Sequence, residues 1–222
     1  MKVLLYCIGQ QEVNAPFHDT RIRVVPSHGL MAVVSEVEGT ATAPSVSALL
    51  AFERVVEAIH ARQTVIPMRY GCVMEGKEQI VQSIEDHRTE YEALLLRLRG
   101  MAEMGIRLLW PPSATPLPSL PRLPGAAYLA SLRNRYNSQD TLAPEEVLLA
   151  DRIVALLDDC FTEQRRELSS SLQGRLLSLY FLTPKNGTEE FRKMVRKIST
   201  PHGVKLLLSG PWPPYNFVAS TA

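Results

Sequence analysis

A proline-rich stretch near the middle of the chain, PPSATPLPSLPRLPG at residues 111–125, most constrains how this sequence can fold. Six of the 16 prolines lie between Pro111 and Pro124. Proline has no backbone N–H and its ring clashes with the preceding helical turn, so the stretch can form neither a helix interior nor a central strand. We therefore predict a semi-rigid linker at 111–124, between an N-terminal domain at 1–110 and a C-terminal domain at 125–222.

Length and composition indicate an ordinary folded protein. The 222 residues, 45% hydrophobic and 21% charged, suffice for two small domains that each bury a core. A net charge of +1 gives no electrostatic case for binding nucleic acid or an anionic membrane. No apolar run approaches the roughly 18 residues of a membrane span. Three widely spaced cysteines, Cys7, Cys72 and Cys160, are typical of a reducing compartment, so we expect a cytoplasmic protein.

The first half of the chain shows strand and helix patterns in turn. An apolar run at 3–8 predicts a buried strand, and runs at 21–25 and 30–37 predict a hairpin. From Val46, apolar residues recur at three- and four-residue steps, which predicts an amphipathic helix of about 17 residues. We expect its buried stripe to be Val46, Leu49, Phe52, Val56 and Ile59. We further expect a β-like stretch at 64–74 with Pro67 at an edge or bulge, one helix over 80–98 with His87 in its apolar stripe, and a strand at 105–110.

The second half predicts more helix. We expect a helix at 126–136, a longer one that starts at Pro144, a buried strand at 176–182 and a final strand at 204–208. Asn186-Gly187-Thr188-Glu189 has the pattern of a helix N-terminus capped by Asn186. Both halves are thus predicted to be small α+β domains in which helices cover a sheet.

Motifs that would indicate chemistry are missing from the sequence. The five histidines have no ligand spacing, and there is no Cys-x-x-Cys, glycine-rich phosphate loop or nucleophile elbow, so we expect no catalytic residue, no metal and no cofactor. Cys72 near Arg69 is the one thiol that a cation could activate, but no histidine supports it. A basic cluster at 192–197 can be a solvated helix face or a contact for phosphate or an acidic partner.

Two stretches remain as candidate partner-binding sites. In SGPWPPYNF, residues 209–217, proline favours polyproline II geometry, which would place Trp212 and Tyr215 on one face of a short rod. We expect this rod to pack on the protein's own surface near the domain boundary, and the alternative is a surface for a partner protein. In IPMRYGCVMEGKEQI, the chain presents two side chains before a bend at Gly71, which can equally be structural. The candidates are Arg69, Tyr70, Trp212, Pro213, Pro214, Tyr215 and Phe217.

These stretches also carry a resemblance. VIPMRYGCVM followed by GKEQI resembles the proline-arginine-aromatic-glycine segment of the gas vesicle protein F/L family, and LSGPWPPYNFV is similar to its more specific C-terminal signature. LLYCIG and AYLASLR also resemble family positions, so the resemblance spans the chain. The chain departs at Cys7, where a small residue is common, and at Cys72, where a hydroxyl residue is expected. No catalysis is attributed to either position.

The resemblance implies a non-enzymatic protein of two α+β domains, the first ferredoxin-like and the second helix-rich with the proline-aromatic tail at 209–222. It implies a minor structural or chaperone-like role in building gas vesicles, in the cytoplasm and in the vesicle. The implied partners are the hydrophobic shell protein and other accessory proteins, with neither nucleic acid nor membrane. A small-ligand-binding regulatory module stays open as the alternative, because ferredoxin-like domains often bind metabolites, and an enzymatic role would rest on Cys72 alone.

Overall fold

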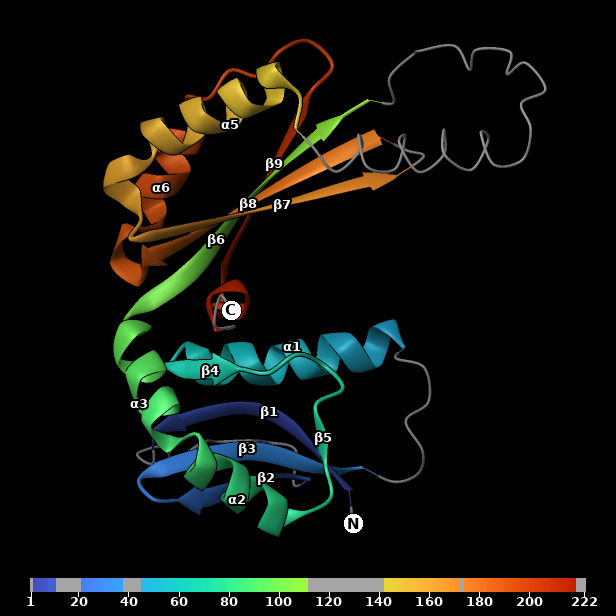
Figure 1. The fold of residues 1–222 in the computed structure, drawn as a ribbon, viewed down its shortest axis with the longest axis vertical. Helices are drawn as coiled ribbons and strands as arrows, with labels where there is room; N and C mark the ends of the chain where they lie inside the picture. The colour runs from blue at the N-terminus through green and yellow to red at the C-terminus, as the bar shows by residue number, and fades with distance from the viewer. Residues whose placement is uncertain (1, 11–20, 38–44, 112–141, 172–173, 219–222) are drawn as a thin grey trace, which may run out of the picture. The chain divides into compact units, whose positions relative to one another are not determined.

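The computed structural model describes residues 2–10, 21–37, 45–111, 142–171 and 174–218 (Figure 1). The chain forms two compact units, Met1–Glu103 with Pro211–Ala222, and Met104–Gly210. The C-terminal tail thus belongs to the first unit, whereas the prediction assigned it to the C-terminal domain. All but the first residue of the predicted linker at 111–124, and the whole predicted helix at 126–136, lie outside the described residues.

The first unit is built around a five-stranded antiparallel sheet with the order β2-β3-β1-β4, in which β5 also pairs with β1. Its strands are β1 (Lys2–Gln10), β2 (Ile22–Ser27), β3 (Leu30–Val37), β4 (Val65–Pro67) and β5 (Val73–Met74), and its helices are α1 (Val46–His60), α2 (Lys77–Asp86) and α3 (Arg88–Arg97). The predicted hairpin is confirmed as β2 and β3. Its two-residue turn is formed by His28 and Gly29, both with positive φ, which suits the right-handed twist of the strands.

Helices cover both faces of this sheet (Figure 1). On one face, Phe52, Val56 and Ile59 of α1 pack on the sheet, and on the other face Ile80, Ile84 and Leu95 of α2 and α3 do so. The pairing of β1 with β3 shifts register between Leu5 and Cys7, which is the signature of a β-bulge. Because of this shift, the consecutive residues Tyr6 and Cys7 both join the cluster beneath α1.

Two predictions for these helices are wrong. Val46 and Leu49 are exposed, so the buried stripe of α1 starts only at Phe52. The single helix over 80–98 is instead α2 and α3, which meet at His87, where φ is −112° and ψ is 15°. His87 is exposed rather than part of the core, and its Nδ1 lies 3.0 Å from the carbonyl oxygen of Ser83. The change of direction lets both helices reach the sheet while His87 faces water.

The second unit contains a four-stranded sheet with the order β7-β8-β6-β9. Its helices lie on the same face of the sheet (Figure 1) and share one apolar core with it, which includes Ile153, Phe181 and Phe191. The first three residues of β6 and the last two of β9 belong to the first unit. The elements are β6 (Met101–Trp110), α5 (Pro144–Leu156), β7 (Glu163–Ser171), β8 (Gly174–Pro184), α6 (Thr188–Val195) and β9 (Lys205–Trp212), with 3₁₀ turns at Asp158–Cys160 and Lys185–Gly187.

Of the two predicted helix starts that the structure describes in this unit, one agrees with the prediction. Pro144 is the first residue of α5, where its missing N–H costs no helical hydrogen bond. The predicted cap of α6 is wrong, because Gly187 rather than Asn186 precedes the helix. Thr188 instead donates its side-chain hydroxyl to the carbonyl of Lys185, which ties the helix to the preceding 3₁₀ turn.

Candidate functional site

The C-terminal tail of the first unit is bent rather than rod-like. Strand β9 continues as far as Trp212, and Pro214 then adopts φ −78° and ψ 60°. The amide of Tyr215 donates to the carbonyl of Pro213 at 2.8 Å, which together with these angles makes an inverse γ-turn centred on Pro214. A 3₁₀ turn, Tyr215–Phe217, follows. The predicted polyproline rod is therefore wrong, because ψ at Pro214 lies far from the extended value of about 145°.

A buried carboxylate holds the tail in place. Both oxygens of Glu103 accept hydrogen bonds from Asn216, one from its backbone amide at 2.8 Å and one from its side-chain amide at 2.7 Å. Glu103 is 5% exposed, so these charge-assisted bonds offset part of the cost of burying its charge. The next residue, Phe217, is fully buried, and its carbonyl accepts a hydrogen bond from the Arg97 guanidinium.

Tyr215 lies on the face of the sheet that α1 covers. Its hydroxyl donates to a carboxylate oxygen of Glu53 on α1 at 3.3 Å. Burial raises the pKa of Glu53, an effect that the Tyr215 hydroxyl opposes and the charge of Glu57 reinforces. Burial and the nearby Glu53 charge together raise the pKa of Tyr215 far above its ordinary value of 10. At neutral pH the phenol therefore keeps its proton and stays a donor.

The segment after β4 packs against the aromatic side chains in the cluster beneath α1. Tyr6 and Phe52 stack with their ring centroids 4.8 Å apart, and Tyr70 meets Phe52 edge-on at 5.4 Å. Tyr70 and Tyr215 thus both pack against the cluster beneath α1. The two stretches that the sequence singled out come together there, although they are far apart along the chain.

A tight turn presents Arg69 beside this cluster. The amide of Cys72 donates to the carbonyl of Arg69 at 3.2 Å, and the amide of Leu5 donates to the carbonyl of Cys72 at 2.8 Å. Gly71 has φ +93°, a value that side chains disfavour, so the predicted bend is confirmed. Arg69 itself is exposed.

The candidate residues differ in accessibility. Pro213, Pro214 and Phe217 are buried, and Tyr70 and Tyr215 are half-buried. Trp212 is 41% exposed, so part of its side chain is left in water and its packing on the protein's own surface stays a prediction, whereas Tyr215 packs against the cluster beneath α1. Trp212 and Arg69 are therefore the two exposed members of this set.

Sequence reasoning missed the residues that hold the tail: Glu53, Arg97, Glu103 and Asn216. One signal was available for Glu103, since a carboxylate inside the apolar run MAEMGI needs a buried partner. Nothing local marks Glu53 or Arg97, because ordinary solvated helix faces carry the same residue types.

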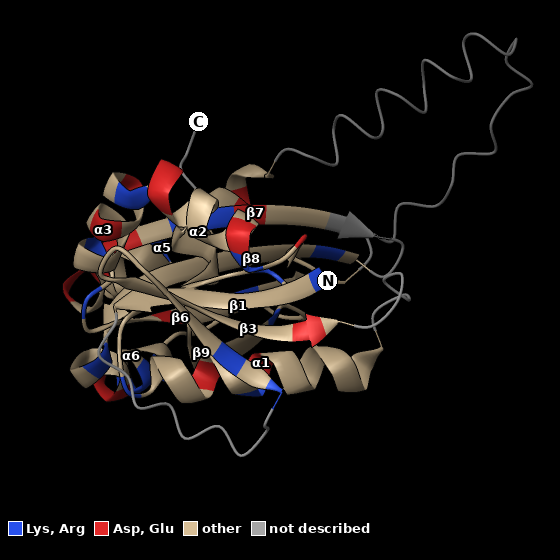
Figure 2. Ribbon diagram, turned by 90° about the horizontal axis from the view of Figure 1, so that it is seen from below, with Lys and Arg blue, Asp and Glu red and all other residues tan. Residues whose placement is uncertain are grey.

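The N-terminal half of α1 adds an exposed apolar surface. Val46, Leu49 and Leu50 are 75%, 41% and 52% exposed, and they occupy neighbouring positions on the helix. Figure 2 shows no charged residue in this half of α1. Glu53, the partner of Tyr215, lies one turn further along the same side as Leu50. We call Val46, Leu49 and Leu50 the α1 apolar patch.

Catalytic features are weak in this unit. Burial raises the pKa of the Cys72 thiol, which is the opposite of the shift that activates a nucleophilic cysteine. Among the described residues, no three His, Cys, Asp or Glu side chains are grouped so that they could hold a metal ion. No helix in the described parts of the chain is long and apolar enough to cross a membrane.

Comparison with known proteins points consistently to one family. The family described as gas vesicle synthesis protein GvpL/GvpF matches residues 2–219. Gas vesicle proteins F2 and L1 of Halobacterium salinarum are 24% and 25% identical to this chain, and each match covers 90% of the chain and 81% of the relative. Crystal structures of GvpF from Anabaena and from Microcystis aeruginosa share the fold, with TM-scores of 0.75 and 0.72 at 17% identity. They cover 100% and 98% of this chain, and 97% and 99% of their own.

Proposed function

This chain belongs to the gas vesicle synthesis protein GvpL/GvpF family and takes part in gas vesicle formation, and we propose that it does so without catalysis, by binding the hydrophobic shell protein. A subunit that turns an apolar face toward gas aggregates when it is free in water, so it needs a partner that covers this face during delivery or in the wall. We propose such a chaperone-like or minor structural role, in the cytoplasm and at the vesicle, together with other accessory proteins.

The observation that carries the proposal is the α1 apolar patch. An exposed apolar side chain is common on a surface, but three at neighbouring helical positions, in a stretch (46–52) that carries no charged residue, form a surface that favours an apolar partner. The patch resembles half of a helix-in-groove contact, in which residues three and four apart on a helix anchor a partner.

The tail and the 69–70 turn supply the second part of the proposed surface. Trp212 combines a large apolar ring with an N–H donor, a residue type that often dominates binding energy. Two buried prolines follow it, and Tyr215 and Phe217 anchor the chain beyond them, so Trp212 is presented with little entropy left to lose on docking. Arg69 adds a cation, and its neighbour Tyr70 packs edge-on against Phe52 in the aromatic cluster.

Co-expression of this protein with the gas vesicle shell protein tests the proposal. Leu50→Asp places a charge in the α1 apolar patch, so we expect it to lower the amount of soluble, co-purifying shell protein about tenfold. Leu96→Asp is the matched control, because Leu96 is 65% exposed on α3 of the same unit. Equal recovery of shell protein with wild type and Leu50→Asp would contradict the proposed site, provided that both variants melt like wild type.

A second candidate is the small-ligand-binding module. A hollow of about 810 Å³ lies at the end of β1 and is lined by polar groups that include Gln10, Gln63, Glu92 and Arg99. We also propose that the first unit is ferredoxin-like, supported by the antiparallel order β2-β3-β1-β4 and by α1, which connects β3 to β4. Thermal melts with a metabolite panel test the ligand role, and a raised Tm that Arg99→Ala abolishes would favour it over the assembly role.

A further inference from the structure

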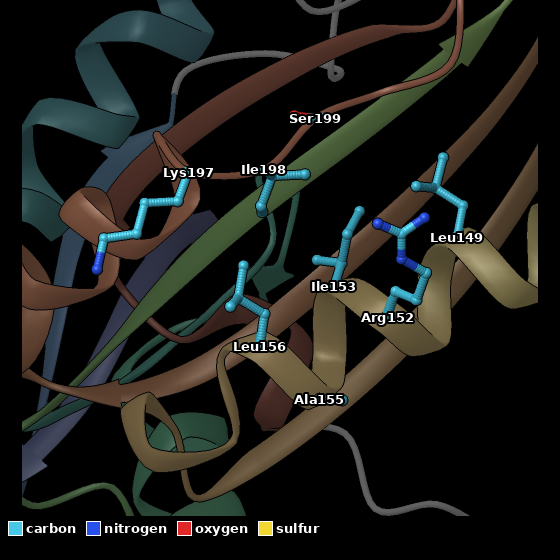
Figure 3. Close-up of a pocket in the computed structure, with 8 residues that line it drawn as sticks. All are labelled: Leu149, Arg152, Ile153, Ala155, Leu156, Lys197, Ile198 and Ser199. Atoms are coloured by element: carbon cyan, nitrogen blue, oxygen red, sulfur yellow. The ribbon is translucent and has the colours of Figure 1, made fainter.

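A groove crosses the second unit between α5 and the chain that leaves α6 (Figure 3). Its volume is about 480 Å³. Leu149 and Ile153 of α5 form its buried floor, and Leu156 and Ile198 form its apolar walls. In the view of Figure 3, Ile198, Ile153 and Leu156 lie between two cationic side chains, Arg152 and Lys197.

Among the described residues that line the groove, the two charged ones, Arg152 and Lys197, are both cationic. In the basic cluster that the sequence marked at 192–197, Arg192 pairs with Glu189, and Lys193 pairs with Glu190 at 3.2 Å. Lys197 contacts only the sulfur of Met194, at 3.3 Å, and neither it nor Arg152 has a carboxylate partner in the part of the chain that the structure describes. The groove therefore offers an apolar floor with Arg152 at one end and Lys197 at the other, where the Lys197 side chain extends away from the floor in Figure 3, and neither cation is paired with a carboxylate among the described residues.

We propose that this groove binds an amphipathic helix of a partner protein whose apolar stripe is flanked by glutamate or aspartate. Apolar side chains would fill the space over Leu149 and Ile153, as in helix-in-groove recognition, and the flanking carboxylates would pair with Arg152 and Lys197. Such rim pairs add modestly to affinity but select the partner by charge and fix its orientation. This inference is independent of shell-protein binding at the first unit.

Charge disfavours two of the occupants that the chain itself could supply. Residues 112–141, outside the described residues, carry three arginines and one aspartate, so they would bring positive charge to a positive groove. A second copy that docked groove to groove would bring the same cations together, because a two-fold interface pairs identical patches. A partner of opposite charge meets neither penalty.

A designed peptide tests the proposal directly. The probe is a fluorescein-labelled peptide of about 18 residues, or roughly five helical turns, with leucine along one face and glutamate on both flanks. Its control has lysine in place of every glutamate. Fluorescence anisotropy with the full chain should show that the glutamate peptide binds at least about tenfold tighter, and that added salt weakens its binding.

Matched variants locate the binding site. We expect Lys197→Glu to weaken binding about fivefold, whereas Lys205→Glu, the same charge change on exposed β9, should alter it less than about twofold. Leu156→Asp should weaken binding about tenfold or more, and Leu148→Asp should have no effect. Leu156 is 38% exposed and lines the groove, whereas Leu148 is 65% exposed on the same helix and does not.

Three results would overturn the inference. The first is equal affinity of the protein for the two peptides. The second is an equal effect on binding of the groove variants and their control variants. The third is no binding of the glutamate peptide at about 1 mM, a concentration at which even a weak specific complex would form. Self-association in sedimentation experiments that Leu156→Asp abolishes would assign the groove to a second copy of this chain. Thermal melts of each variant show that it is folded before its affinity is compared.

Discussion

Replacing Phe217 by alanine should detach the C-terminal tail from the first unit and lower its stability. The Phe217 side chain is fully buried, and a phenylalanine buries on the order of 200 Å². At about 25 cal/mol per Å² this burial contributes about 5 kcal/mol, and measured phenylalanine-to-alanine changes in cores cost about 3–5 kcal/mol. For a chain of this length each kcal/mol shifts Tm by roughly 2–4 °C, so we expect Tm to fall by roughly 6–20 °C.

Thermal melting and hydrogen exchange measure this effect at two levels. Melting reports whether the tail contributes to the cooperative unfolding of the unit. Exchange reports local detachment, because the amides of Asn216 and Phe217 donate to Glu103 and to the carbonyl of Pro214 in the docked tail. In Phe217→Ala we expect both amides to lose protection.

Two control variants give the comparison its meaning. Leu96→Ala, at an exposed position of the same unit, should change the free energy of unfolding by less than about 0.5 kcal/mol. Trp212→Ala should lower the free energy of unfolding by less than half as much as Phe217→Ala does. It should nevertheless weaken shell-protein binding as strongly as Phe217→Ala does. Wild-type melting of Phe217→Ala, with unchanged exchange at Asn216, would refute the conclusion that the tail is anchored.

Three further predictions concern buried contacts. Glu103→Gln replaces one of the two acceptors of Asn216 by a donor, so urea unfolding should show a loss of about 1–3 kcal/mol, and an unchanged midpoint would contradict the hydrogen-bond geometry. Burial raises the pKa of Glu53, so between its ordinary value of 4.5 and the raised one the folded state binds more protons, and stability falls as pH rises. Glu53→Gln should flatten this slope in melts from pH 4 to 8, and an unaltered slope would argue against the shift. A Cβ at Gly105 would lie 2.7 Å from the Ser209 hydroxyl, so Gly105→Ala should lower Tm. Adding Ser209→Ala should restore most of the lost Tm, because it removes the hydroxyl. No restoration in the double variant would locate the strain elsewhere.

Apolar periodicity was enough to predict β1, the hairpin, α1 and α5, because burial against a sheet or helix decides those segments. It could not find β7, whose sequence EQRRELSSS has neither an apolar run nor strict alternation. This strand lies at the edge of its sheet and is held by backbone pairing with β8, from Glu163–Leu182 to Ser171–Gly174. An edge strand buries little side-chain surface, so its sequence does not need the apolar pattern by which strands are predicted.

The candidate site was predictable in its aromatic members and not in their partners. Tyr70 and Tyr215 stood out because local chemistry, a glycine bend and a run of prolines, marks their surroundings. Glu53 and Glu103 become special only through contacts with residues more than 100 positions away, which no local pattern records. Contacts of that range depend on the completed fold.

The tail shows why its aromatic residues have different fates. Proline fixes φ near −65°, a value shared by an edge strand, a polyproline helix and the centre of an inverse γ-turn, so the prolines restrict the chain without selecting among these. The choice falls to ψ at Pro214, which bends the chain so that Tyr215 reaches Glu53 and Phe217 reaches the core. The same bend leaves Trp212 behind on the strand, partly in water. The free energy that holds the tail in place thus comes from the residues after the bend, and we propose that the exposed part of Trp212 contacts an external partner.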